Sequence, residues 1–233
     1  MNRSGSSRNA LMSIIREMYA GSERPRLGAT LGWVLATTVA VVLVWSRLYA
    51  VDRLTWWLES IWVVVGLPLA IAVARTRGVT TLLLTWLAGH AVVLLVGARY
   101  TYEFVPLGEW IQAWTGSSRN NFDRFGHFLQ GFVPALLARE LLRRATPLRP
   151  DRWLGLLCVA CALAFSALFE MIEWGASVAL GASADAYLGS QGDPWDAQWD
   201  MFCALVGASF SIALLSGWHE AQLCVLARTS RQR

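Results

Sequence analysis

The sequence contains no lysine and comparatively few charged residues of any kind. Charged residues make up 15% of its 233 residues, whereas hydrophobic residues make up 55%, above the roughly 45–50% typical of soluble globular proteins. All of its basic residues are arginines, which reflects codon bias in the source genome, and they lie mostly in short segments between apolar runs. This distribution argues against a nucleic-acid partner and favours an integral membrane protein.

Signatures of several familiar protein classes are also missing. The chain has no P-loop, no nucleophile motif and no His-Glu-x-x-His zinc signature, which counts against ATP-driven pumps and the common hydrolases. The four cysteines lie in or directly after apolar runs, so the sequence predicts no disulfide framework. We also expect no cleavable secretory signal, because residues 1–26 are polar and the apolar run behind them is too long.

Apolar runs that approach the length needed to cross a bilayer, about 20 residues in a helix, recur along the chain. The clear ones are Leu27–Trp45, Trp56–Ala74, Val79–Ala98 and Trp153–Leu180, and Met201–Leu215 becomes long enough if its helix begins near Gln198. A sixth run, Phe125–Leu142, carries polar residues and is interrupted by Pro134. We expect it to form a kinked helix that the other helices shield from lipid.

The predicted fold is therefore all-α, a polytopic bundle of about six transmembrane helices over residues 27–217. It is flanked by an N-terminal segment, 1–26, and a C-terminal tail, 218–233. Arginine is concentrated in the segments that this topology places on one side, and positive residues accumulate on the cytoplasmic side of membranes. We expect a multi-pass protein of a bacterial inner membrane with both termini in the cytoplasm. In its long outer loop, the spacing of Trp110 and Trp114 predicts a short interfacial helix.

Ionisable residues collect at one predicted depth, near the outer ends of three helices. They are Asp123 and His127 at the start of one helix, Glu170 and Glu173 late in the next, and Asp196 and Asp200 at the start of the last. Glu170 lies roughly 26 Å along a helix that begins near Trp153, close to the outer edge of a hydrocarbon core of about 30 Å. Since burying each such group in a membrane costs a few kcal/mol, this convergence indicates a site.

Four of these residues, His127, Glu170, Glu173 and Asp200, are the candidate catalytic residues. Close carboxylates beside a histidine suit general acid–base chemistry. The same four side chains also offer oxygen and nitrogen ligands for a divalent metal ion such as Zn²⁺, Mn²⁺ or Mg²⁺. A structural role stays open as well, because carboxylates also pair with arginine and cap helices.

Arginines on the predicted outer side are exceptions to the rule that positive residues accumulate on the cytoplasmic side. Two of them, Arg119 and Arg124, directly precede the helix that carries His127. Guanidinium groups bind phosphate well. We therefore expect an anionic lipid head group, such as that of a phospholipid or a polyprenyl phosphate, to bind here. The candidate substrate-binding residues are Arg119, Arg124, Asp123, Gln130, Asp193 and Asp196. The alternative is that the arginines pair with these acids and only stabilise the loop.

Longer motifs surround the clustered residues. They are Tyr100-Thr101-Tyr102-Glu103, Arg119-Asn120-x-Phe122-Asp123-Arg124-x-Gly126-His127-Phe128, Glu170-x-x-Glu173-Trp174, and Gln191-Gly192-Asp193-x-Trp195-Asp196. Over roughly residues 30–217 the sequence resembles the uncharacterised inner-membrane family typified by YjdF, and more loosely the VanZ-type membrane proteins. The resemblance implies the membrane location and the helical fold, and it implies no established reaction.

Three functions remain open at this point. The first is an envelope enzyme or lipid-handling protein that acts on an anionic head group at the outer leaflet. The second is a proton-coupled transporter or lipid flippase that uses the carboxylates as a proton relay. Transporters often carry broken helices in two related halves, and here only the helix with Pro134 is visibly interrupted. The third is a membrane scaffold without chemistry.

Overall fold

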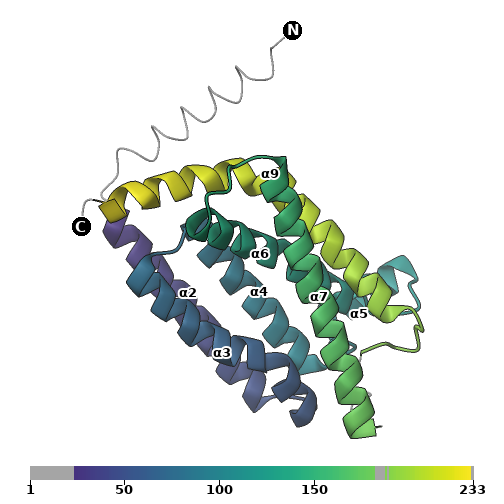
Figure 1. The fold of residues 1–233 in the computed structure, drawn as a ribbon. Coiled ribbons are helices and arrows are strands. Elements are labelled where there is room, and N and C mark those ends of the chain that lie inside the picture. The colour runs from purple at the N-terminus through teal and green to yellow at the C-terminus, as the bar shows by residue number, and fades with distance from the viewer. Residues whose placement is uncertain (1–23, 182–186, 188, 232–233) are drawn as a thin grey trace.

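The computed structural model describes residues 24–181, 187 and 189–231, and Figure 1 shows that this part of the chain is a bundle of helices. The helices are α2 (Arg24–Leu48), α3 (Arg53–Arg77), α4 (Thr81–Tyr100), α5 (Pro106–Thr115), α6 (Phe122–Ala145), α7 (Arg152–Leu180) and α9 (Asp196–Arg231). No strand occurs among the described residues, which confirms the predicted all-α class. Most of the predicted N-terminal segment, residues 1–23, lies outside them.

Helix boundaries follow from local capping chemistry. The side chain of Asp52 accepts a hydrogen bond of 2.7 Å from the amide of Thr55, and Thr80 caps α4 in the same way. Asp151 accepts hydrogen bonds from two amides at the start of α7. Such caps satisfy amide groups that would otherwise have no partner at the first turn of a helix. The predicted helices are therefore present, most of them a few residues longer than their apolar runs.

Five helices are long and apolar enough to cross a membrane: α2, α3, α4, α7 and α9. The remaining long helix, α6, has 24 residues and therefore a length of about 36 Å, and it continues without interruption past Pro134. Its polar composition sets it apart from the other five. Most of its first five turns is buried, and Ala135 and Leu136 are fully buried. The expectation that this helix is shielded from lipid agrees with that burial.

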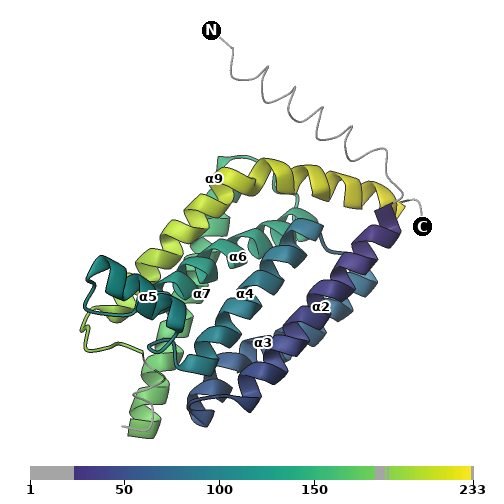
Figure 2. The same ribbon diagram turned by 180° about the vertical axis from the view of Figure 1, so that it is seen from behind.

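The helices form two groups that meet in the middle of the bundle. On one side α4 packs against α2 and α3, and on the other α6 packs against α7 and α9. Contacts between α4 and α6 join the two groups, as the opposite views of Figures 1 and 2 show. The short helix α5 lies beside the end of the bundle that holds the starts of α6 and α9. We call this end the α5 end.

Two glycines let α6 and α9 approach each other backbone to backbone. A Cβ atom at Gly131 would lie 1.8 Å from the carbonyl oxygen of Ala204, and one at Gly207 would lie 1.9 Å from a carbonyl oxygen of α6. Small residues permit such close contacts between membrane helices. The contact lies one helical turn beyond His127 on α6 and one turn beyond Asp200 on α9. It therefore fixes the separation of these two side chains.

The last helix is much longer than the apolar run within it. The sequence predicts a tail from residue 218, whereas in the structure α9 continues to Arg231. Figure 1 shows the C-terminal part of α9 turning across the end of the bundle opposite the α5 end. We call residues 218–231 the roof, and the end that they cover the roof end. Hydropathy identifies only the membrane-spanning part of this helix, so it misses the roof.

Buried polar contacts hold the roof to α6 and to the turn before α4. His219 is fully buried, and its Nε2 lies 3.1 Å from Oε2 of Glu140. The hydroxyl of Thr80 donates a hydrogen bond of 2.7 Å to the same carboxylate. Glu220 pairs with Arg139 and Arg143, at 2.7 Å and 2.6 Å. These groups satisfy one another's hydrogen-bonding needs, so the network has a structural role: it clamps the roof to the bundle.

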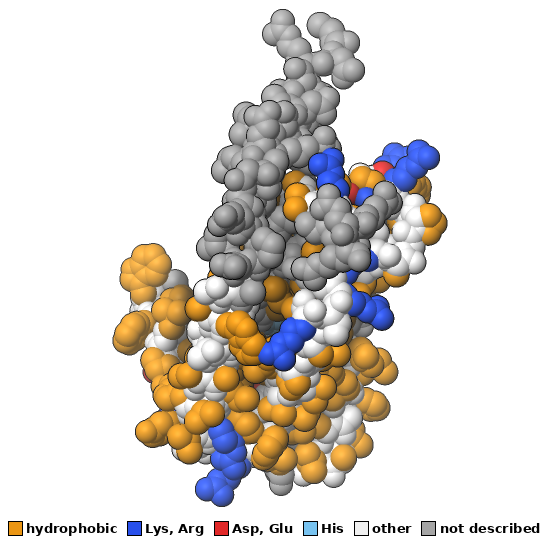
Figure 3. Space-filling view, turned by 90° about the vertical axis from the view of Figure 1, so that its left-hand side faces the viewer, with side chains coloured by type: hydrophobic (Ala, Val, Ile, Leu, Met, Phe, Trp, Pro, Cys, Tyr) orange, Lys and Arg blue, Asp and Glu red, His pale blue; other side chains and the backbone are white. Residues whose placement is uncertain are grey.

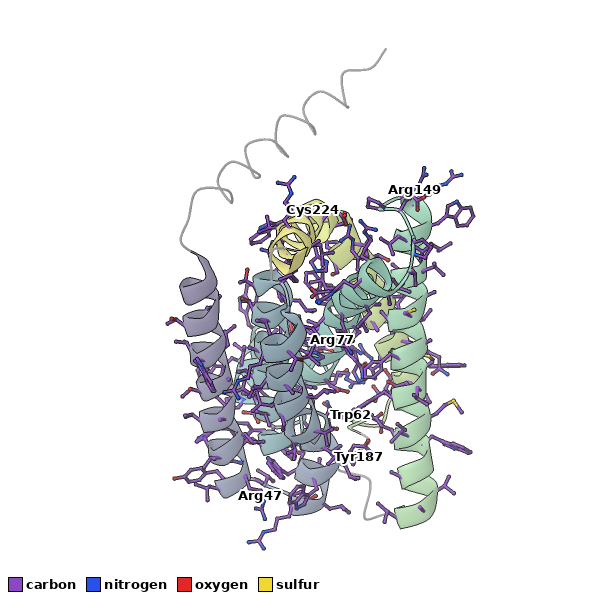
Figure 4. All side chains as sticks on the ribbon, turned by 60° about the vertical axis from the view of Figure 1, so that its left-hand side comes forward. Arg47, Trp62, Arg77, Arg149, Tyr187 and Cys224 are labelled. Atoms are coloured by element: carbon purple, nitrogen blue, oxygen red, sulfur yellow. The ribbon has the colours of Figure 1, made fainter. Side chains whose placement is uncertain are left out.

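The surface of the bundle suits a membrane. Figure 3 shows hydrophobic side chains over the flank of the helices, with arginines mainly toward the two ends. Figure 4 places Arg47 and Tyr187 at the α5 end and Arg149 and Cys224 at the roof end. On α5, the predicted interfacial helix, Trp114 is 86% exposed. Tryptophan prefers the boundary between hydrocarbon and water, so this side chain is placed as a membrane anchor would be.

Candidate functional site

Four helices bring ionisable side chains together inside the α5 end. All of them are buried, and they are Glu59 on α3, Asp123 and His127 on α6, Glu170 and Glu173 on α7, and Asp196 and Asp200 on α9. We call these seven residues the acidic cluster. The structure therefore brings together all four candidate catalytic residues of the sequence analysis. Asp123 and Asp196, expected to bind substrate, lie in the same cluster.

His127 stands between two carboxylates. Its Nε2 lies 3.5 Å from Oδ1 of Asp123, one turn earlier on α6, and its Nδ1 lies 3.5 Å from Oε1 of Glu170 on α7. The ring packs edge-on against Phe169, with centroids 5.9 Å apart. A neutral imidazole carries one N–H and one lone pair, so it can donate to only one of its two carboxylates. The arrangement therefore needs a further proton or a cation.

Asp200 completes a compact group of three possible metal ligands. Asp123, His127 and Asp200 each offer one ligand atom, and these atoms all lie within 4.8 Å of one another. Among the described residues, Oδ1 of Asp200 has no hydrogen-bond partner, nor does Nδ1 of His127 or Oε1 of Glu170. Buried polar atoms are normally satisfied. Nδ1 of His127 and Oε1 of Glu170 lie 3.5 Å apart and can satisfy each other, whereas the unpaired Oδ1 of Asp200 indicates that something else binds there.

Glu59 and Tyr102 belong to this region, and the sequence analysis missed both. They line a small pocket of about 10 Å³, roughly the space for one water molecule, together with Asp123, His127 and Glu173. The Tyr102 hydroxyl hydrogen-bonds to the Glu59 carboxylate, and burial together with that carboxylate raises the pKa of the hydroxyl well above its ordinary value. Tyr102 therefore stays neutral and donates.

A signal for each residue was present in the sequence. Glu59 is the one acidic residue inside the predicted span Trp56–Ala74, and an acid within a span is by default a candidate for function. Tyr102 lies in one of the motifs, and its ring rests on Gly97, where a Cβ atom would come within 2.3 Å. Neither signal says how α3 is rotated in the bundle, and that rotation decides whether Glu59 faces the cluster.

The predicted anion-binding arginines already have acidic partners. Arg119 is buried and forms an ion pair with Asp196, and its guanidinium also lies 3.6 Å from Asp193 and 3.9 Å from Asp123. Arg124 pairs with Asp193 at 2.7 Å. These pairs join the loop before α9 to the start of α6. The geometry thus agrees with the structural alternative for both arginines, although the Nε atom of each has no hydrogen-bond partner among the described residues.

A large apolar cavity lies next to the acidic cluster. Its volume is about 1130 Å³, and its walls come from α2, α3, α4, α6 and α7. Three residues, Leu94, Gln130 and Phe169, line both this cavity and the small pocket of the cluster. At the side of the cavity, Trp62 of α3 contacts Phe169 of α7 with ring centroids 6.1 Å apart, and Figure 4 shows it between the two helices.

Two buried polar side chains line the mostly apolar cavity away from the arginines at its roof end. Gln130, a predicted substrate-binding residue, is 5% exposed, and its Oε1 has no hydrogen-bond partner among the described residues. The same holds for Nε2 of His90, on a side chain that is 9% exposed. An apolar cavity with a few unpaired polar groups is typical of a ligand-binding site.

The fold and the acidic cluster define a polytopic membrane protein with a buried polar site beside an apolar cavity. Residues 31–221 match the family described as "Predicted membrane protein (DUF2238)", and the chain belongs to that family. It is 46% identical over 188 residues to "Inner membrane protein YjdF" of Escherichia coli (strain K12), an alignment that covers 81% of this chain and 90% of the relative. These matches confirm the resemblance to the YjdF-like family seen in the motifs. No solved structure matches the chain.

Proposed function

We propose that this protein binds a membrane lipid, with the lipid chain in the apolar cavity and its polar head group at the acidic cluster. The observation that carries the proposal is the junction between the two spaces at Leu94, Gln130 and Phe169. A chain in the cavity would end beside His127, because both spaces share these walls. The cavity volume, about 1130 Å³, lies slightly above the roughly 300–1,000 Å³ of sites that take drug-sized ligands.

The charge of the cluster restricts the head group. Six carboxylates face one imidazole and the guanidinium of Arg119, which is already paired. A cationic or zwitterionic head group fits this charge directly. A phosphate, as expected from the sequence, fits only if bound cations or protons first offset the carboxylates. Under the orientation that the arginines predict, the site would lie in the outer leaflet of the inner membrane.

A cavity-filling substitution tests the proposal. Gly66 of α3 lines the cavity, and an added Cβ atom there meets no atom within 4 Å. Phenylalanine at this position should occupy the space without disturbing its neighbours. Gly175 of α7 has the same open surroundings and does not line the cavity, so Gly175→Phe is the matched control.

The measurement is the lipid that copurifies in mild detergent, identified by mass spectrometry and compared with the composition of the host membrane. One lipid class should be enriched in the native protein and in Gly175→Phe, and several-fold depleted in Gly66→Phe. Equal enrichment in all three proteins, or no enrichment in the native protein, would refute lipid binding in the cavity. Each protein should be monodisperse by size-exclusion chromatography before it is compared.

A second function, movement of the lipid across the membrane, is favoured by the extent of the cavity. Its walls run from Arg75 and Gly78 at the roof end to Gln130 and Phe169 beside the cluster. A proton-coupled flippase would need such a path and a titratable group at its end. Proteoliposomes with a fluorescent lipid in one leaflet distinguish the two functions. Binding without pH-driven transfer supports a lipid-binding protein or enzyme, and transfer that depends on Glu170 supports the flippase.

A further inference from the structure

We propose that Asp123, His127 and Asp200 bind one divalent transition-metal ion, Mn²⁺ or Zn²⁺, and that Glu170 positions the histidine for it. Carboxylate oxygens suit Mn²⁺ and an imidazole nitrogen suits Zn²⁺, so a site that offers both kinds of ligand can hold either ion. The inference deepens the proposed function by supplying the positive charge that a phosphate head group needs. The metal site itself depends only on these side chains.

The three ligand atoms lie near one another. Bonds from zinc to oxygen and nitrogen are roughly 2.0–2.2 Å long, so two ligand atoms of one tetrahedral ion lie about 3.4 Å apart. The observed atoms lie within 4.8 Å of one another. The ligand atoms would have to approach one another by up to about 1.4 Å, which rotations of the three side chains can supply. The backbone contact at Gly131 holds α6 and α9 at this separation.

The second observation is the unsatisfied oxygen of Asp200. Asp200 is 2% exposed, and its Oδ1 has no hydrogen-bond partner in the described part of the chain. A carboxylate oxygen in that position either carries a proton or lacks its ligand, because an unpaired buried charge costs several kcal/mol. Arg119 reaches Asp123 only at 3.9 Å, and its closest partner is Asp196. It therefore does not neutralise Asp200 directly.

The surroundings of the His127 imidazole indicate which of its two nitrogens would bind the ion. Nε2 faces Asp123, which places the proposed ion on that side of the ring, and Nδ1 faces Oε1 of Glu170. Histidines that bind metals usually donate their other N–H group to a carboxylate or carbonyl, which fixes the tautomer and the ring orientation. Glu170 is placed for that role. With a metal ion on Nε2 and a proton donated from Nδ1 to Glu170, both nitrogens of His127 have a partner although the ring lies between two carboxylates.

A titration of the purified full-length protein tests the site. Protein stripped with a chelator and exchanged into chelator-free buffer is titrated with Mn²⁺, and free Mn²⁺ is followed by electron paramagnetic resonance. The native protein should bind about one equivalent, and Zn²⁺ should displace it. Asp200→Asn and His127→Ala should weaken binding by well over tenfold. Glu170→Gln should weaken it by about 10–100-fold, the range found for carboxylates that orient a ligand.

Glu109→Gln is the matched control, because Glu109 is an exposed carboxylate on α5 at the same end of the bundle. It should leave the affinity unchanged. No saturable binding by the native protein would overturn the proposal, and so would equal affinity in native protein and Asp200→Asn. The native titration is decisive even if a variant fails to fold. If metal binding is absent while lipid enrichment is retained, the metal site is overturned and the proposed lipid binding stands. If lipid enrichment alone is absent, the proposed lipid binding is overturned and the metal site stands.

Discussion

Replacing Gly131 with alanine should force α6 and α9 apart and disrupt the acidic cluster from a distance. The added Cβ atom would lie 1.8 Å from the carbonyl oxygen of Ala204, whereas ordinary contacts begin at 3.4 Å. The obstacle is backbone, so no side-chain rotation relieves it. The two helices must therefore separate or slide by about 1.6 Å at this point, one turn away from the proposed metal ligands.

The energetic consequence follows from the rigidity of that contact. Overpacking in a well-packed interior typically costs 1–3 kcal/mol, and a clash with backbone belongs at or above the top of that range. We expect a loss of about 3 kcal/mol, which for a chain of this size corresponds to a thermal midpoint roughly 6–12 °C lower. Affinity for Mn²⁺ should fall as well, because Asp200 moves away from His127.

Thermal unfolding in detergent, followed by intrinsic tryptophan fluorescence, measures the effect. The control is Gly89→Ala on α4, where an added Cβ atom meets nothing within 4 Å. Alanine is the better helix former by up to about 1 kcal/mol, so this change should be neutral or slightly stabilising. A thermal midpoint for Gly131→Ala equal to that of Gly89→Ala would show that the helices are not in close contact and would refute the reasoning.

Three further predictions concern the network before α9, the roof and the topology. Arg119→Lys should lose about 1–3 kcal/mol of stability, because an ammonium cannot bind Asp196 and the carbonyl groups of Gly189 and Ser190 at once, yet lipid enrichment should not change; a specific loss of lipid would restore the phosphate-binding role of this arginine. His219→Ala removes a buried partner of Glu140 and should cost about 1–3 kcal/mol by thermal unfolding, without affecting Mn²⁺ affinity; unchanged stability would contradict the clamp. A reporter at the C-terminus should be cytoplasmic and one inserted near Ser117 external; both on one side would contradict a spanning α6.

The helical fold could be predicted because hydropathy and the positions of acids report on single helices. The apolar runs located α2, α3, α4 and α7 to within a few residues. The position of Glu170 along its own helix was enough to place it at the depth of His127. Depth depends only on counting residues from a helix start, so it is accessible from sequence.

Features that depend on rotation and loop path could not be predicted in this way. Glu59 faces the cluster because of how α3 is rotated, which hydropathy does not report. The roof is held across the bundle because Glu140 and the arginines of α6 bind it, although polar and apolar residues alternate too closely in it for hydropathy to mark it as a span. The partners of Arg119 depend on how the loop before α9 folds back over α6. In each case the deciding contact joins residues that are far apart in sequence.

The burial of α6 has a consequence for how the protein is made. This helix is too polar to be stable among lipids alone, and the partner that covers it most extensively, α9, is synthesised about 50 residues later. Until α9 is made, α4 and α7 are the helices available to cover α6, and the face of α6 that packs against α9 stays open. Chains that stop before α9 would expose Asp123 and His127 to the bilayer. The acidic cluster, two of whose residues lie on α9, therefore forms only after that last helix is made.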